Sequence, residues 1–113
     1  MDKNKDASGA NSTNISSRLD EFRRRIDAFD EEIVRLLNNR AACANEIGEV
    51  KDSVGMETYQ PSREEDVLAH VRDVNAGPLA NDAITRVFEQ IIDESRRLER
   101  LTSEKVRAES SGE

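Results

Sequence analysis

The chain has 113 residues, enough for one small domain. Its formal net charge is −7 and 36% of its residues are charged, so its bulk electrostatics argue against a nucleic-acid partner. Aromatic residues are 4% of the chain and tryptophan is absent, so few bulky side chains are available for an independent core, which favours helices and oligomerisation.

Residues 1–16 are mostly small and polar and are predicted to form a disordered N-terminal tail. Ser16 or Ser17 can then cap a helix that runs to about Lys51 or Ser53. We expect a helical domain over residues 17–101, followed by a disordered C-terminal tail over residues 102–113.

Apolar side chains recur every three or four residues along this first helix, which is the pattern of an amphipathic helix with one long contact face. The residues of this stripe are Leu19, Phe22, Ile26, Phe29, Ile33, Leu36, Arg40, Cys43, Ile47, Val50 and Val54. About 35 residues of helix span roughly 50 Å, more than the shorter helices of the chain can cover. A second copy of the same helix can cover the stripe, so we predict a two-fold homodimer.

Two shorter helices follow a loop over residues 53–61. Ser62 and Glu65 have the spacing of a capping box for the second helix, which stops at Asn75-Ala76-Gly77-Pro78 with Gly at the C-cap. The third helix starts near Asn81 and frays after about Leu101. No strand pattern occurs, so the fold class is all-α: a three-helix chain with one long N-terminal helix, in an antiparallel homodimer.

Charged residues interrupt or flank these apolar faces. Arg40 occupies a position of the stripe, and a buried guanidinium is costly unless an anion meets it. Arg23 and Lys51 flank the stripe but are 28 residues apart, about 42 Å along one helix, so they cannot bind one small ligand from the same chain. In an antiparallel pair that crosses near Val34, Arg23 of one copy lies beside Arg40 and Lys51 of the other.

With Arg63 from the start of the second helix, such a dimer would assemble two pockets of four cations each, suited to a small dicarboxylate. Glu64 beside Arg63, and Ser95 and Glu99 on an otherwise apolar face of the third helix, are further candidate site residues. There is no nucleophile paired with a base, no phosphate-binding loop and no metal-ligand cluster. We therefore expect a site that works by positioning and electrostatics, with no metal and no cofactor.

Cys43 is the only cysteine, which leaves no internal disulfide, and no apolar run is long enough for a membrane span. No secretory leader pattern is present. We expect a soluble, cytoplasmic protein without a membrane partner.

In order and spacing, several stretches of the chain together resemble the all-helical, AroQ-type chorismate mutases. They are residues 18–27, Leu36-Leu37-Asn38-Asn39-Arg40, Glu46-Ile47-Gly48-Glu49-Val50-Lys51, Tyr59-Gln60-Pro61-Ser62-Arg63-Glu64, residues 75–79 and residues 88–96. The resemblance covers residues 17–101. It implies an intertwined homodimer with two shared active sites that convert chorismate to prephenate by a Claisen rearrangement.

The resemblance also implies a role for each site residue. Arg23 of the partner chain and Arg40 would bind a substrate carboxylate, Lys51 a carboxylate and the ether oxygen, and Arg63 and Ser95 the second carboxylate. Glu64 would accept a hydrogen bond from the substrate hydroxyl, which the backbone of Gln60 would also contact. Glu99 would face the ether oxygen. Ile47 and Ile92 would form apolar walls. Arg40, Lys51 and Glu99 are the predicted catalytic residues.

Two positions depart from the commonest pattern of that family. Gln60 stands where many members have Asp, which matters little if the contact is through the backbone. Glu99 stands where some members have Gln and others Glu, and an ionised carboxylate would repel the oxygen that gains charge. We predict that burial raises the pKa of Glu99 so that it is protonated in the complex, and that activity falls as the pH rises above neutrality.

Two other functions stay open at this point. An isochorismate-pyruvate lyase of the same fold would use a similar cationic pocket. A non-catalytic dimerisation module, or a regulatory mutase-like domain, would keep the helices without the chemistry.

Overall fold

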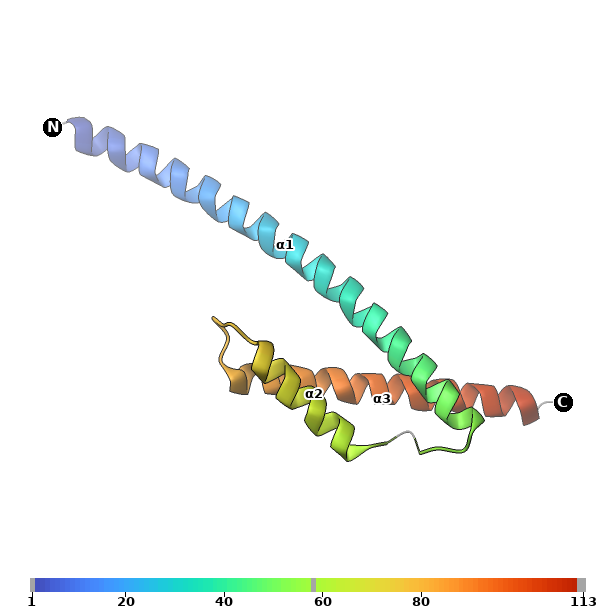
Figure 1. Cartoon of the computed structure of the whole chain (residues 1–113). Helices are drawn as coiled ribbons and strands as arrows, with labels where there is room; N and C mark the ends of the chain where they lie inside the picture. Colours follow the sequence, from blue (N-terminus) through green and yellow to red (C-terminus); the bar gives the residue numbers. More distant parts are fainter. Residues whose placement is uncertain (1, 58, 112–113) are drawn as a thin grey trace. The chain divides into compact units, whose positions relative to one another are not determined.

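The computed structural model consists of three helices, α1 (Asp2–Ser53), α2 (Pro61–Val74) and α3 (Asn81–Ser111) (Figure 1). It describes residues 2–57 and 59–111, and within these ranges there is no strand, so the all-α prediction is confirmed. Met1 and residues 112–113 of the predicted tails, and Thr58 of the predicted loop, lie outside the described residues.

The chain divides into two units, residues 1–36 and residues 37–113, and α1 contributes to both. In the first unit the apolar stripe is exposed in the single chain, with Phe22 48% and Phe29 60% accessible. Arg23 forms an ion pair with Asp20 there, 3.7 Å from Nη1 to Oδ1. The predicted homodimer, which would cover this stripe, stays a prediction at this point.

The helix ends differ from the predicted ones. α1 begins at Asp2, well before the Ser16–Ser17 start that the sequence indicated, and α3 continues past Leu101 to Ser111. The polar composition of these ends carries little stripe pattern, which is why the sequence placed the boundaries inside them. The division of the chain into one domain and two tails stays a prediction.

The C-terminal end of α1 is closed by a glycine turn. Gly55 has a left-handed φ of 73°, which a residue without Cβ adopts without strain. Its N–H donates to the Asp52 carbonyl at 3.2 Å, and the Met56 N–H donates to the Lys51 carbonyl at 2.8 Å. These bonds satisfy carbonyls that the last turn of a helix leaves unpaired. They fix the backbone of the last turn of α1, which carries Lys51.

The start of α2 corrects the predicted capping box. The N-cap is Gln60, whose side chain makes no capping hydrogen bond, and Pro61 is the first helical residue. Proline suits this position because its fixed φ is helical and its missing N–H would be unpaired there anyway. It also keeps the preceding residue extended, and Gln60 has φ −132° and ψ 97°. The Gln60 carbonyl then accepts the N–H groups of Arg63 and Glu64 at 3.1 and 3.3 Å.

The turn after α2 also differs in detail from the prediction, because the C-cap is Asn75 and not a glycine. The Asn75 side chain accepts the Gly77 N–H at 3.1 Å and donates to Leu79 O and to Asn81 Oδ1, both at 2.8 Å. Gly77 takes the left-handed φ of 77° that the turn requires. One side chain thus joins the end of α2 to the predicted start of α3.

Helices α2 and α3 lie side by side as an antiparallel pair (Figure 1). Arg72 donates to Thr85 at 3.2 Å near the turn, and Arg96 donates to Glu64 at 3.0 Å at the far end. The part of α1 after residue 37 contacts α3 through Arg40 and Ser95 and, further along both helices, through Asp52 and Ser103. Residue numbers rise along both helices from the first contact to the second, so the two segments run in the same direction.

The buried core of the described residues is small and lies along α2 and α3. Val71 is 9% exposed, Ile92 8% and the polar Ser95 8%. None of the helices in the described ranges has an apolar run of the length and hydropathy that a bilayer span requires. The predicted cytoplasmic location stays a prediction.

Candidate active site

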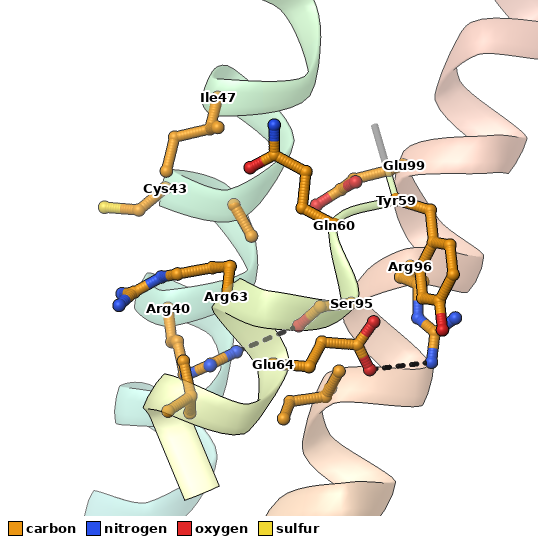
Figure 2. A pocket seen from close by; sticks show the side chains of 13 residues that line it. Arg40, Cys43, Ile47, Tyr59, Gln60, Arg63, Glu64, Ser95, Arg96 and Glu99 are labelled. Atoms are coloured by element: carbon orange, nitrogen blue, oxygen red, sulfur yellow. Dashed lines mark hydrogen bonds and ion pairs between the residues drawn. The ribbon is translucent and has the colours of Figure 1, made fainter. Parts of the chain in front are cut away.

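A cavity of about 290 Å³ lies within the second unit, between the last part of α1, the α1–α2 connection, the start of α2 and the middle of α3 (Figure 2). This volume is near the lower end of the range for small-molecule sites, about 300 Å³. The cavity is lined by Arg40, Cys43, Ala44, Ile47, Tyr59, Gln60, Arg63, Glu64, Val67, Ile92, Ser95, Arg96 and Glu99.

Arg40 is a half-buried cation at the wall of this cavity. Its Nη1 donates to the Ser95 hydroxyl at 3.3 Å, a long and neutral hydrogen bond (Figure 2). Among residues 2–57 and 59–111 no carboxylate lies within ion-pair distance of Arg40. A partly dehydrated guanidinium with only a hydroxyl for a partner favours an anion from outside the chain.

Arg63 and Gln60 come to the cavity from the start of α2. Pro61 and the Gln60 carbonyl fix the first turn of α2. This turn places both Arg63 and Glu64 at the cavity. Arg63 is exposed, and it makes no ion pair within the described part of the chain. It is therefore a second cation available to an anionic ligand.

Glu64 is already paired with a cation from α3. Its Oε1 accepts from Arg96 Nη2 at 3.0 Å, and the same nitrogen donates to Asp93 Oδ1 at 3.0 Å. The Arg96 guanidinium also lies over the Tyr59 ring, 4.8 Å from Cζ to the ring centroid (Figure 2). The negative charge of Glu64 is therefore offset before any ligand enters.

Glu99 is half-buried on α3, where Gly48 of α1 leaves room for its carboxylate. A Cβ at Gly48 would lie 3.5 Å from Glu99 Cγ and 3.6 Å from Oε2. Burial raises the pKa of Glu99 above its ordinary value, and Asp52 adds to this, although Lys51 and Arg96 pull the pKa down. The predicted direction of the Glu99 pKa is confirmed.

Six of the eight predicted site residues surround one cavity: Arg40, Gln60, Arg63, Glu64, Ser95 and Glu99. The two predicted apolar walls, Ile47 and Ile92, line it as well. Lys51 is half-buried but does not line the cavity, although it is close enough to Glu99 for its charge to act there. Arg23 belongs to the first unit, and its predicted place in a partner's site stays a prediction.

Tyr59 and Arg96 line the cavity without having been assigned a role from the sequence. The signal for Arg96 was present, because it flanks the face of α3 formed by Ile92, Ser95 and Glu99 just as Arg23 and Lys51 flank the stripe of α1. Tyr59 had no such signal, since a side chain in a loop has no periodic position. Cys43, expected as an apolar stripe residue, is exposed and lies at the cavity.

The family model for chorismate mutase type II matches residues 22–100. The chain belongs to this family, so the resemblance found in the sequence is confirmed.

The chain is also similar to individual chorismate mutases. The chain is 40% identical over 90 residues to the bifunctional chorismate mutase/prephenate dehydratase of Neisseria gonorrhoeae, a match that covers 76% of this chain and 24% of that protein. It is 25% identical over 84 residues to the chorismate mutase of Methanocaldococcus jannaschii, covering 74% of this chain and 85% of that one. The chain thus spans about a quarter of the bifunctional relative.

A solved structure has the same fold. Form II of the chorismate mutase from Thermus thermophilus superposes with a TM-score of 0.72 at 35% identity, covering 74% of this chain and 94% of that chain.

Proposed function

We propose that this chain is a chorismate mutase, which converts chorismate to prephenate by an intramolecular Claisen rearrangement. The observation that carries the proposal is Arg40, a half-buried cation at a cavity of small-ligand size that has no carboxylate partner among the described residues. The substrate is a dicarboxylate, and forked guanidinium groups bind carboxylates at two points.

Arg40 and Arg63 hold the two substrate carboxylates. The Ser95 hydroxyl accepts a hydrogen bond from Arg40, so its own proton is free to point to a carboxylate oxygen. Glu64 Oε2 accepts a hydrogen bond from the substrate hydroxyl, because Oε1 already accepts one from Arg96. The carbonyl of Gln60 is occupied by the start of α2, so the backbone contact of Gln60 falls to its N–H.

The chemistry needs no nucleophile, because one molecule breaks its ether C–O bond while it forms a new C–C bond. Holding the flexible substrate in the reactive conformer supplies much of the rate, since positioning can contribute several kcal/mol, about 7–11 in favourable cases. Negative charge grows on the ether oxygen in the transition state. Lys51 and protonated Glu99 stabilise it by donating hydrogen bonds, which an ionised Glu99 would not do.

We infer that the working form is an antiparallel homodimer, in which the exposed stripe of α1 is covered by its copy. The exposure of Phe22, Phe29 and Ile33 supports this, because covering apolar area is favourable by about 25 cal/mol per Å². The partner's Arg23 would complete the carboxylate site, as the family resemblance implies. Two active sites would then form per dimer.

The test is a turnover assay with purified protein and chorismate. Loss of the diene absorbance is followed at mildly acidic and mildly alkaline pH, and the product is identified. Prephenate, formed faster at the lower pH, is the expected result.

The same assay separates the other functions. Pyruvate released from isochorismate, without prephenate from chorismate, would identify a lyase. A dimer in solution that turns over neither substrate would contradict an enzymatic function and leave a dimerisation or regulatory module.

A further inference from the structure

Arg96 contacts three separate parts of the second unit with one guanidinium. It lies on α3, its Nη2 is 3.0 Å from Glu64 Oε1 on α2, and its Cζ is 4.8 Å from the ring centroid of Tyr59 in the α1–α2 connection. The same Nη2 also forms an ion pair with Asp93 Oδ1, one turn earlier on α3, at 3.0 Å. Figure 2 shows the Glu64 carboxylate turned toward Arg96 and the Tyr59 ring over it.

This arrangement is not the one that would satisfy Arg96 best. Both carboxylates bind one terminal nitrogen, while Nε is shut off from water and has no hydrogen-bond partner among the described residues. An unpaired buried donor costs free energy. The planar face of the guanidinium is used for Tyr59, which a lysine ammonium could not match.

The contact holds geometry more than it adds stability. The Arg96 and Glu64 side chains are 40% and 24% exposed, and pairs this open to water contribute little to the free energy of unfolding. The main effect of the Arg96 contacts is on the positions of two neighbouring side chains. Arg96 fixes the Glu64 carboxylate by Oε1 and leaves Oε2 without a partner in the described part of the chain. It also anchors Tyr59, the neighbour of Gln60, at the rim of the cavity.

We propose that Arg96 is a positioning residue that sets recognition of the substrate hydroxyl, by fixing the Glu64 carboxylate and by seating the Tyr59–Gln60 segment at the cavity. The proposal rests on the proposed function, because it assigns the hydroxyl to Glu64. Arg96 acts through these two neighbours and not on the reacting atoms.

The chain provides its own probe for this contact. Tyr59 is the only tyrosine and there is no tryptophan, so ultraviolet fluorescence reports this ring alone. Arg96→Gln and Arg96→Lys should both lower the fluorescence anisotropy of Tyr59, because both remove the stacked plane. Arg97→Gln, a change at the exposed neighbour on α3, is the matched control and should leave the anisotropy unchanged. Unchanged anisotropy in both Arg96 variants would overturn the seating of Tyr59.

The second measurement compares chorismate with an analogue in which hydrogen replaces the ring hydroxyl. Arg96→Gln should lower kcat/KM for chorismate roughly tenfold, as small misplacements of binding groups do, and should change kcat/KM for the analogue little. Arg96→Lys should recover part of the loss, since the ammonium can still bind Glu64. In a Glu64→Gln background, Arg96→Gln should have a smaller effect on kcat/KM than in the wild type, because only the route through Tyr59 and Gln60 is left.

The outcomes separate the proposal from the function beneath it. An equal loss on both substrates, or a loss with lowered thermal stability, would mean that Arg96 has a structural role and would overturn the proposal. No turnover of chorismate by the unmodified chain would overturn the proposed function, and the hydroxyl recognition with it, whatever Tyr59 shows.

Discussion

Two apolar stripes with the same helical spacing have opposite environments in this chain. In the middle of α3 the stripe is covered within the second unit, where Ile92 and Ser95 are each 8% exposed. On the first part of α1 the stripe stays open in the single chain, and Phe29 is 60% exposed. Spacing therefore identifies a face that will be buried, but it does not tell which molecule covers it.

The difference also divides the work of the proposed site. The cavity with Arg40, Arg63 and Glu99 is formed within one chain. The exposed part of the α1 stripe, within residues 1–36, would instead cover its copy in the proposed dimer and bring the partner's Arg23 to that cavity. The variants below test the two regions separately.

The largest effect is expected for Arg40→Ala. Loss of this cation should lower kcat/KM by roughly 10² to 10³, as loss of a single charge-stabilising group does in other enzymes. The fold should be kept, because within the described residues the Arg40 side chain makes a single hydrogen bond, to Ser95. Turnover and thermal unfolding are measured together, with the exposed Arg100→Ala as control.

A folded Arg40→Ala variant with unchanged turnover would contradict the assignment of this cavity as the active site. It would favour the interpretation of Arg40 as a structural element of the stripe.

The next effect is expected for Phe29→Asp, which places a carboxylate on the exposed stripe. The charge would be buried in the dimer without a partner, so we expect the dimer to dissociate and activity to fall roughly tenfold or more. Light scattering gives the mass and the chorismate assay the rate. Glu31→Ala, on the opposite face of the same helix, should change neither.

A Phe29→Asp variant that is monomeric and fully active would show that the cavity works without the partner. Arg23 would then have no role in the reaction.

The sequence was enough to predict the helices that carry these regions. The spacing from Leu19 to Val54 predicted α1. The next two helices were predicted to start at Ser62 and near Asn81, and they start at Pro61 and Asn81. Arg40 stood out because a charge replaced an apolar residue. Such local patterns are retained in the fold because each is a property of one helix.

What the sequence could not predict depends on contacts between helices. Arg96 pairs with Glu64 across the α2–α3 interface and with Tyr59 in a connection, and neither distance follows from sequence spacing. The cap of α2 was assigned to Ser62 because a capping box is a common pattern, whereas Pro61 begins the helix without a side-chain cap.

A smaller effect is expected for Glu99→Gln, and only above the pKa of Glu99. Burial raises this pKa, so below it the carboxyl is protonated and the wild-type rate is at its plateau. As the pH rises through the raised pKa the carboxyl ionises and the rate falls, with a slope that approaches about tenfold per pH unit above the pKa. Glutamine carries no such proton, so the pH profile of the variant should be flat there; an unchanged profile would contradict the role of Glu99.

The titration of Glu99 should also appear in the pH dependence of the free energy of unfolding, when the wild type is compared with Glu99→Gln. From the ordinary value of 4.5 up to the raised pKa, the unfolded state releases the Glu99 proton before the folded state does. The wild type therefore loses free energy of unfolding with rising pH over this interval, relative to Glu99→Gln. Thermal unfolding at several pH values measures the difference.

The smallest effect is expected for Gly48→Ala, at the place where α1 passes closest to Glu99. The added methyl would lie 3.5 Å from Glu99 Cγ and 3.6 Å from Cδ, which is ordinary contact and not a clash. Alanine also removes the cost of a glycine inside a helix, so the free energy of unfolding should rise by about 0.5–1 kcal/mol.

The same methyl gives Gly48→Ala a second, independent readout. It would lie 3.6 Å from Glu99 Oε2 and reduce the access of solvent to the carboxylate, and lower hydration favours the protonated form. The fall in rate with pH should therefore move to higher pH, with little change in the plateau. A rate profile that does not move while stability rises would show that the Glu99 carboxylate turns away from α1 in solution, and that the pKa of Glu99 is set by α3 and its own neighbours.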